Sequence, residues 1–279
     1  MKKELDDFIK NALLEDIGEG DHSSLASIKK HTKSQAHLVV KNEGIIAGVE
    51  LAKIIFKQVD SSIEFKCKIN DGQKVKVGDI AFIVKGNAIS ILNAERLVLN
   101  CMQKMSAIAT KTNQFNKLIA DTNCKLLDTR KTTPLNRIIE KWAVRIGGGH
   151  NHRFGLYDMI MIKDNHIDFA GGISEALKKV KEYLSFNNKN LEIVVEARNL
   201  NEVKEIINIG GIKRILLDNF DYNTTKKAVS IINKKFQSES SGQITENNII
   251  KYAKCGVDFI SVGSLTHSLS NFDLSLKAI

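Results

Sequence analysis

The chain has 279 residues, and 43% of them are hydrophobic. This is enough for one large α/β domain or two smaller ones with an ordinary buried core. No apolar run approaches the roughly 20 residues needed to cross a bilayer. The charged amphipathic pattern of residues 1–17 is not that of a signal peptide. We therefore expect a globular, cytoplasmic protein with no membrane partner.

The net charge of +9 permits nucleic-acid binding, but the lysines are scattered and no aromatic-studded basic strand or recognised reader motif is present. We expect no nucleic-acid partner. The four cysteines have no C-x-x-C or Cys/His spacing, and three of them lie in apolar surroundings typical of reduced core residues. We expect neither disulfides nor zinc.

The first part of the chain has mixed periodicity. Residues 2–14 place apolar side chains at helical spacing, and an acidic, glycine-bearing turn at 15–21 ends this helix. From residue 35 to residue 82 the period shortens toward two, which predicts an α+β unit. Its strands are expected at 36–40, 63–67 and 81–84, with a helix at 51–59 among them.

A strongly amphipathic helix is predicted at 91–105. From periodicity alone, Arg96 is an ordinary exposed arginine of this helix.

After Cys124 the organisation changes to a repeat of apolar strand, polar residue and helix. The separations are about 20 to 35 residues, as expected for successive β/α units. Helical patterns fill the gaps near 174–183, 200–208, 224–234 and 245–254. The residues just past the apolar runs are Asp128, Lys163, Glu196, Asp218, Ser240 or Ser241, and Gly263.

Strands that each end in a polar residue are typical of a β/α barrel, whose ligand site lies at the carboxyl ends of its strands. A doubly wound sheet is the alternative, but it would concentrate such residues at one switch point. Nearly every strand here contributes one, which favours the barrel. The segments Ser240–Gly242 and Gly263–Leu265 follow late strands, where barrels commonly hold a phosphate through backbone N–H groups.

The stretch 125–166 carries an excess of Lys and Arg over Asp and Glu, with two histidines in addition. Arg130, Lys131 and Lys163 directly follow apolar strands, where a solvated basic face would not be concentrated. A helix is predicted at about 135–146, and the three glycines 147–149 let the backbone pass close to a ligand. The pattern suits a polyanionic small molecule.

The motifs DTRKTTP, GGGHNHRFGLYD, IKDNHI, LLDN, ESSG and ISVGSLTHS resemble those of the quinolinate phosphoribosyltransferase family, and the resemblance covers almost the whole chain. It implies a pentosyltransferase of NAD biosynthesis. Such an enzyme transfers phosphoribosyl from phosphoribosyl pyrophosphate to quinolinate, with loss of CO₂ and pyrophosphate and a requirement for Mg²⁺, to give nicotinate mononucleotide.

The resemblance also implies a fold and an assembly. An N-terminal α/β sandwich domain at 1–108, completed by 267–279, would be joined to an incomplete, open α/β barrel at 109–266. The family works as a homodimer or a higher assembly of dimers.

Carried over by position, the resemblance implies the roles of individual residues. Those that hold the quinolinate carboxylates would be Arg130, His152, Arg153 and Lys163, with Arg96 reaching in from the neighbouring subunit. Thr129 and Lys131 would lie in the substrate site, with Lys131 on the pyrophosphate side. Glu196 and Asp218 would meet the ribose hydroxyls and Mg²⁺, partly through the substrate. The 5′-phosphate would be held by Ser241, Gly242, Gln243, Gly263, Ser264 and Leu265, with His267 nearby. Lys131, Lys163, Glu196 and Asp218 are the expected catalytic residues.

Three positions depart from the family pattern. Leu135 and Ala107 stand where many members have glycine, and we expect both to be packing changes. Gln243 stands where many have the second glycine of a phosphate loop, so it keeps a backbone N–H but asks for a φ that glycine adopts freely.

Two alternatives are open at this point. One is a paralogue of the same fold with another acceptor, of the molybdenum-transport-linked type. The other is a non-catalytic anion-binding protein that kept the barrel. The set Arg130, His152, Arg153 and Lys163 argues against the first, and Glu196 with Asp218 argues against the second.

Overall fold

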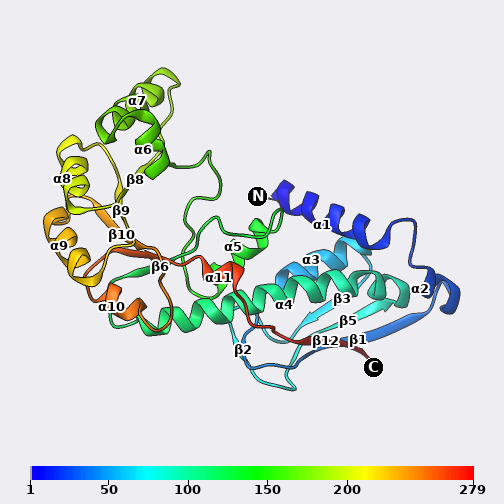
Figure 1. Ribbon diagram of the computed structural model, residues 1–279. Coiled ribbons are helices and arrows are strands. Elements are labelled where there is room, and N and C mark those ends of the chain that lie inside the picture. Colours follow the sequence, from blue (N-terminus) through cyan, green and yellow to red (C-terminus); the bar gives the residue numbers. More distant parts are fainter. Residues whose placement is uncertain (1) are drawn as a thin grey trace. The chain divides into compact units, whose positions relative to one another are not determined.

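The computed structural model describes residues 2–279, which form two compact units (Figure 1). The first unit contains the N-terminal part as far as Asn113, together with Thr132–Gly148 and Leu265–Ile279. The second contains Gln114–Lys131 and Gly149–Ser264. Residues 132–148 therefore belong to the first unit, although the resemblance places them within the barrel domain. No helix among the described residues is both long enough and apolar enough to cross a membrane.

The first unit is built on a four-stranded sheet in the order β12-β1-β5-β3. Its strands are β1 (Lys33–Val40), β3 (Glu64–Cys67), β5 (Ile80–Asn87) and β12 (Leu274–Ala278), and the paired strands are antiparallel. The C-terminal strand β12 lies beside β1, so the end of the chain completes this sheet. A separate pair joins β2 (Gly44–Ile45) to β4 (Lys74–Val75).

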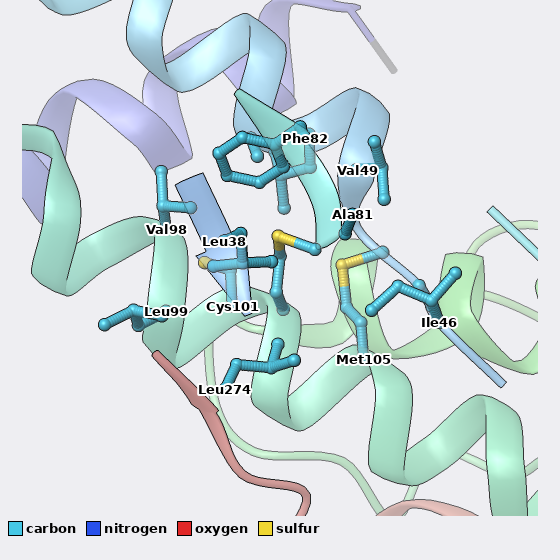
Figure 2. Packing of buried hydrophobic residues seen from close by; sticks show 14 of the residues in the cluster. Leu38, Ile46, Val49, Ala81, Phe82, Val98, Leu99, Cys101, Met105 and Leu274 are labelled. Atoms are coloured by element: carbon cyan, nitrogen blue, oxygen red, sulfur yellow. The ribbon is translucent and has the colours of Figure 1, made fainter. Parts of the chain in front are cut away.

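The helices of the first unit include α1 (Lys2–Ile17), α2 (His22–Ser27), α3 (Val49–Val59) and α5 (Arg137–Ile146). Helix α4 (Ala88–Leu118) belongs to this unit as far as Asn113. Figure 2 shows Cys101 and Met105 of α4 packed with Leu38 and Phe82 of the sheet. These four side chains are buried. Removing their apolar surface from water is the main favourable term in folding this unit.

Helix α4 continues well past the predicted end at residue 105. Polar residues interrupt its apolar pattern beyond that point, but two of them face inward. The Ser106 hydroxyl accepts a hydrogen bond from the Ala47 backbone N–H at 3.0 Å, and the Thr110 hydroxyl accepts one from the Ile45 N–H at 2.9 Å. These hydroxyls satisfy backbone N–H groups in and just after β2. Because polar residues face inward here, hydrophobic periodicity alone did not detect the rest of the helix.

The second unit is built on a six-stranded sheet in the order β6-β11-β10-β9-β8-β7, and every adjacent pair is parallel. Its strands are β6 (Lys125–Leu127), β7 (Ile160–Ile162), β8 (Ile193–Ala197), β9 (Arg214–Asp218), β10 (Gln237–Ser241) and β11 (Phe259–Ser261). Strands β6 and β7 are not paired with each other, so the sheet does not close. The predicted open α/β barrel with a separate N-terminal sheet domain is therefore confirmed.

Helices alternate with these strands along the chain. They include α6 (Asp164–Ala170), α7 (Ile173–Phe186), α8 (Leu200–Ile209), α9 (Tyr222–Ile232) and α10 (Ile249–Ala253). Helices α8, α9 and α10 pack against β8, β10 and β11. The short helix α6 was not predicted, because it begins directly after Lys163 within a polar stretch. The short helix α11 (Ser264–His267) follows β11.

Strand register decides which side chains share a face of the parallel sheet. Glu196 lies beside Leu216, and Asp218 lies beside Ser241. Because alternate residues of a strand face opposite sides, all four lie on one face. We call this the site face. A cluster of Met161, Val194 and Leu216 packs on the same face and supports the polar groups above it.

Candidate functional site

The carboxyl end of the six-stranded sheet collects the charged residues that were predicted for the barrel. Lys163 follows β7, Glu196 lies near the end of β8, and Asp218 ends β9. Parallel strands have their carboxyl ends at the same edge, so these groups converge although they are far apart in sequence. The sequence pattern predicts this convergence, because it indicates alternating strands and helices and because alternate residues of a strand face the same side of the sheet.

One cation and one carboxylate of this edge form an ion pair. The Lys163 Nζ lies 3.2 Å from the Glu196 Oε2. Glu196 is only 5% exposed, and burial raises the pKa of its carboxyl group. The Lys163 charge opposes this rise in the pKa, whereas the nearby Asp218 carboxylate adds to it. Two neighbouring carboxylates, one of them buried, favour a bound cation.

A second cluster at this edge contains two arginines. Arg153 is 8% exposed, and its guanidinium donates to the Met159 carbonyl at 3.4 Å. Burial lowers the pKa of Arg153, and the positive charge of Arg130 lowers it further. Arg130 is exposed and follows β6. Two guanidinium groups close enough to repel each other favour a bound anion, and their planar forks suit a carboxylate.

The loop that carries Arg153 is held by a buried carboxylate. The backbone N–H of His150 donates to the Leu126 carbonyl at 2.8 Å, which places the loop beside β6. The fully buried Asp128 then accepts from the backbone N–H of His152 at 2.8 Å and from the Asn151 side chain at 2.6 Å. Asp128 therefore fixes the loop rather than meeting a ligand directly.

Thr129 and Lys131 lie in the loop that follows β6. The Thr129 hydroxyl accepts from the backbone N–H of Lys131 at 3.0 Å, and Lys131 is exposed. The loop continues into the first unit, where the backbone N–H of Thr133 donates to the buried Glu140 at 3.3 Å. The Lys104 Nζ lies 3.4 Å from that same carboxylate. This ion pair, in which only Glu140 is buried, anchors the end of the loop and was not identified from the sequence.

The segment after β10 has the tight backbone expected of an anion-binding loop. Gly242 has φ +98°, and a Cβ atom there would lie 2.2 Å from the Asn219 Oδ1, so only glycine fits. The Asn219 backbone N–H donates to the Ser241 carbonyl at 2.9 Å, which holds this loop against the end of β9. Gly263 and Ser264 follow the neighbouring strand β11.

The three departures have different structural consequences. Gln243 takes φ +49°, the left-handed backbone that was expected of it. Ala107 is buried in the first unit's core. The expectation that Leu135 is a packing change is wrong, because its side chain is 91% exposed and its backbone has φ +64°. At this φ the Cβ atom of a leucine crowds the neighbouring backbone, so the substitution costs conformational free energy rather than changing the packing.

Three predicted residues, Arg96, Leu265 and His267, belong to the first unit. Arg96 is exposed on α4. The Leu265 side chain is fully buried, so only its backbone is available to a ligand. The His267 Nδ1 lies 2.8 Å from the Ser268 hydroxyl.

The donor set of the second unit limits which metal it can hold. Among residues 2–279 there is no group of three or more His, Cys, Asp or Glu side chains suited to a metal ion. Glu196 and Asp218 offer two neighbouring carboxylates instead. Mg²⁺ commonly binds through one or two carboxylates plus substrate phosphates and water, so this pair fits Mg²⁺ and does not fit structural zinc.

Two family models match the chain. The model of the C-terminal domain of quinolinate phosphoribosyl transferase matches residues 108–277, and that of its N-terminal domain matches residues 21–106. The nicotinate-nucleotide pyrophosphorylase [carboxylating] of Arabidopsis thaliana chloroplasts is 46% identical, over 96% of this chain and 81% of its own. The mitochondrial quinolinate phosphoribosyltransferase [decarboxylating] 2b of Nicotiana tabacum is 44% identical, over 98% of this chain and 82% of its own.

Solved structures agree with these matches. The nicotinate-nucleotide pyrophosphorylase of Francisella tularensis is 40% identical with a TM-score of 0.92, covering 100% of this chain and 97% of its own. NadC from Streptococcus pyogenes is 34% identical with a TM-score of 0.92, covering 100% of this chain and 98% of its own.

The raised pKa of Glu196 predicts a stability effect that depends on pH. The folded state favours the protonated carboxyl, so this group stabilises the fold at low pH and loses that contribution as the pH rises through its raised pKa. The Glu196→Gln variant has no carboxyl to ionise. We expect its Tm to exceed that of the parent by a few degrees near pH 8, with a smaller difference near pH 4.

Thermal unfolding of both proteins across this pH range measures the difference. The control is Glu192→Gln, which removes an exposed glutamate paired with Lys213 at 3.0 Å. The difference in Tm between this variant and the parent should not increase with pH. A difference between Glu196→Gln and the parent that stays constant or shrinks as the pH rises would contradict the prediction.

Proposed function

We propose which residues carry out the reaction of this chain, which belongs to the quinolinate phosphoribosyltransferase family. It is a pentosyltransferase of NAD biosynthesis that transfers phosphoribosyl to quinolinate with decarboxylation. The observation that carries the residue assignments is the pair of opposite clusters at one sheet edge. Arg130 and Arg153 form a cationic cluster, and Glu196 and Asp218 form an anionic one.

The cationic cluster binds the acceptor. Quinolinate carries two adjacent carboxylates, and Arg130, Arg153 and Lys163 supply fixed positive charge for them. The buried Arg153 has lost part of its hydration, so an anion that replaces the missing water gains more there than at an exposed arginine. His152 precedes Arg153 in the loop held by Asp128 and belongs to the same substrate site.

The anionic cluster binds the ribose and Mg²⁺. Glu196 and Asp218 accept hydrogen bonds from the ribose hydroxyls and would hold the ion together with the substrate's phosphates. An ion held by these carboxylates would supply positive charge that stabilises the leaving pyrophosphate. Lys131, exposed in the loop that follows β6, adds a cation on the same side. As the C1–O bond lengthens, the ribose gains oxocarbenium character, which the two carboxylates stabilise.

The 5′-phosphate is placed against the backbone that follows β10 and β11. Ser241, Gly242 and Gln243 form one segment, and Gly263, Ser264 and Leu265 form the other. The close packing of Gly242 on Asn219 supports this assignment, because it presents backbone N–H groups without an obstructing side chain. His267 stands near this phosphate in the family pattern.

The reaction needs no covalent enzyme intermediate. The ring nitrogen of quinolinate attacks C1 of the ribose, and the pyrophosphate leaves with the electron pair of the broken C–O bond. When the 2-carboxylate of the resulting pyridinium ion departs as CO₂, the bonding electrons stay on ring C2, where the adjacent cationic nitrogen stabilises them. A proton from water then binds to C2 and gives nicotinate mononucleotide. The enzyme's contribution is to hold the two substrates in line and to match their charges.

The sequence motifs alone left two alternatives open, a paralogue with a different acceptor and a non-catalytic anion-binding protein. The sequence relatives named above favour the family's own reaction over both.

Purified protein should consume quinolinate only when phosphoribosyl pyrophosphate and Mg²⁺ are both present, and nicotinate mononucleotide and CO₂ should form in equal amounts. Nicotinate lacks the 2-carboxylate and would make fewer contacts with the cationic cluster, so its kcat/KM should be lower by about 100-fold or more. Steady-state assays with both acceptors measure this ratio. Comparable turnover of nicotinate would overturn the assignment of the acceptor.

We also propose a homodimer in which Arg96 serves the partner's site. The proposal is supported by the family resemblance and by the exposure of Arg96 on α4. A two-fold dimer presents the same face of each subunit to the other, so a residue from one chain can complete the site of the second.

Subunit mixing tests this arrangement with two inactive variants, Arg96→Ala and Lys163→Ala. If Arg96 completes the partner's active site, one site of a mixed dimer carries both substitutions and the other carries neither. With random pairing about half the dimers are mixed, so activity should recover to about a quarter of the parent value. Verified subunit exchange without recovery would place Arg96 outside the shared site.

A further inference from the structure

A buried glutamate lies beneath the site and has no role in the reaction described above. Glu239 is in the middle of β10, beside Leu216 of β9 and Phe259 of β11, and therefore on the site face. It is 0% exposed. A buried carboxylate is costly unless cations or hydrogen bonds compensate its charge, so its neighbours indicate why it is there.

Arg214 supplies the first compensating charge. Its Nη1 donates to the Glu239 Oε2 at 2.8 Å. The guanidinium lies 3.9 Å from the centre of the Phe259 ring and within 3.4 Å of the Gln237 side-chain oxygen. Burial alone raises the pKa of Glu239, but interactions with His152 and Arg214 outweigh it and hold the pKa below its usual value. The carboxylate is therefore ionised at neutral pH.

His152 faces the same carboxylate oxygen as Arg214 does. Its Nε2 is 3.4 Å from the Glu239 Oε2, an electrostatic contact longer than a well-formed hydrogen bond. Its Nδ1 accepts a hydrogen bond from the backbone N–H of Arg153 at 2.7 Å. An accepting Nδ1 carries no proton, so the ring proton is on Nε2 and faces the carboxylate.

These contacts form one chain from the interior of the sheet to the cationic cluster. The His152 side chain is only 4% exposed, and both of its ring nitrogens face protein groups. Its backbone N–H is held by Asp128 at 2.8 Å. The backbone of Arg153 is thus fixed through a ring whose tautomer is set by the carboxylate below it.

We infer that Glu239 is a positioning residue for quinolinate binding, acting through the His152 ring to fix the backbone from which Arg153 reaches the substrate. The inference rests on the proposed function, because it takes Arg153 as a ligand of the acceptor. His152 then supports the loop and is not itself the main contact to a carboxylate. Arg214 keeps Glu239 ionised and in place.

The Glu239→Gln variant tests this role. We expect the KM for quinolinate to rise by about tenfold, as for other losses of positioning, with the KM for phosphoribosyl pyrophosphate changed by less than about twofold. A purely structural role would lower the amount of active protein without this selective change. Glu192→Gln is the matched control, because it removes an exposed glutamate of the same unit. An unchanged KM for quinolinate in soluble Glu239→Gln protein would overturn the inference.

A double-mutant cycle tests whether the effect passes through His152. If it does, Glu239→Gln should add little to the KM change already caused by His152→Ala. Fully additive effects would contradict the proposed route. A parent enzyme that fails to turn over quinolinate would instead contradict the proposed function, so the two failures are distinguishable.

Glu239→Gln leaves the buried Arg214 charge without its partner, which can prevent folding. Nitrogen-15 spectra of histidine-labelled parent protein avoid this difficulty. The resonances of His152, assigned by their loss in His152→Gln, should show a proton on Nε2 and none on Nδ1. A proton on Nδ1, or a mixture of tautomers, would overturn the inference whatever the variants do.

Discussion

The structure depends on the register of one parallel sheet. Because Glu196, Leu216 and Glu239 are neighbours across three strands, and Asp218 and Ser241 are neighbours one step further on, polar groups from separate β/α units share one face and one edge. A shift of a single residue in any strand would turn its polar group toward the helices. Apolar contacts among Met161, Val194 and Leu216 hold this register from below, so burial of apolar surface decides where the charges stand.

Groups of like charge are kept close together at this edge, which is unfavourable in the free protein. The pKa of Glu196 is raised and that of Arg153 is lowered, in each case by burial first and by a neighbouring group of the same sign second. In our proposal the substrates and Mg²⁺ bring further opposite charge to both clusters, so binding relieves repulsion that folding imposed. Two other buried carboxylates, those of Asp128 and Glu239, contact the loop that carries Arg153 and hold it in position.

Much of this architecture was predictable from the sequence, because short apolar runs ending in one polar residue predict parallel strands with a ligand site at their ends. The supporting residues were not predictable in the same way. Glu239 lies within a strand of polar residues, where nothing in the pattern separates a buried carboxylate from an exposed one, and its partners Arg214 and His152 are distant in sequence. Leu135 shows a different limit, since its positive φ is a property of the loop's path, which side-chain type alone does not reveal.

The central claim is that the cationic and anionic clusters bind different parts of the reactants. Isothermal titration of quinolinate into the protein, without phosphoribosyl pyrophosphate, tests it most directly when the parent is compared with Arg130→Met and Glu196→Gln. Arg130→Met should weaken quinolinate binding by about tenfold or more, a loss of about 1.4 kcal/mol, whereas Glu196→Gln should leave the Kd nearly unchanged. The opposite pattern, with quinolinate binding lost in Glu196→Gln and kept in Arg130→Met, would contradict it.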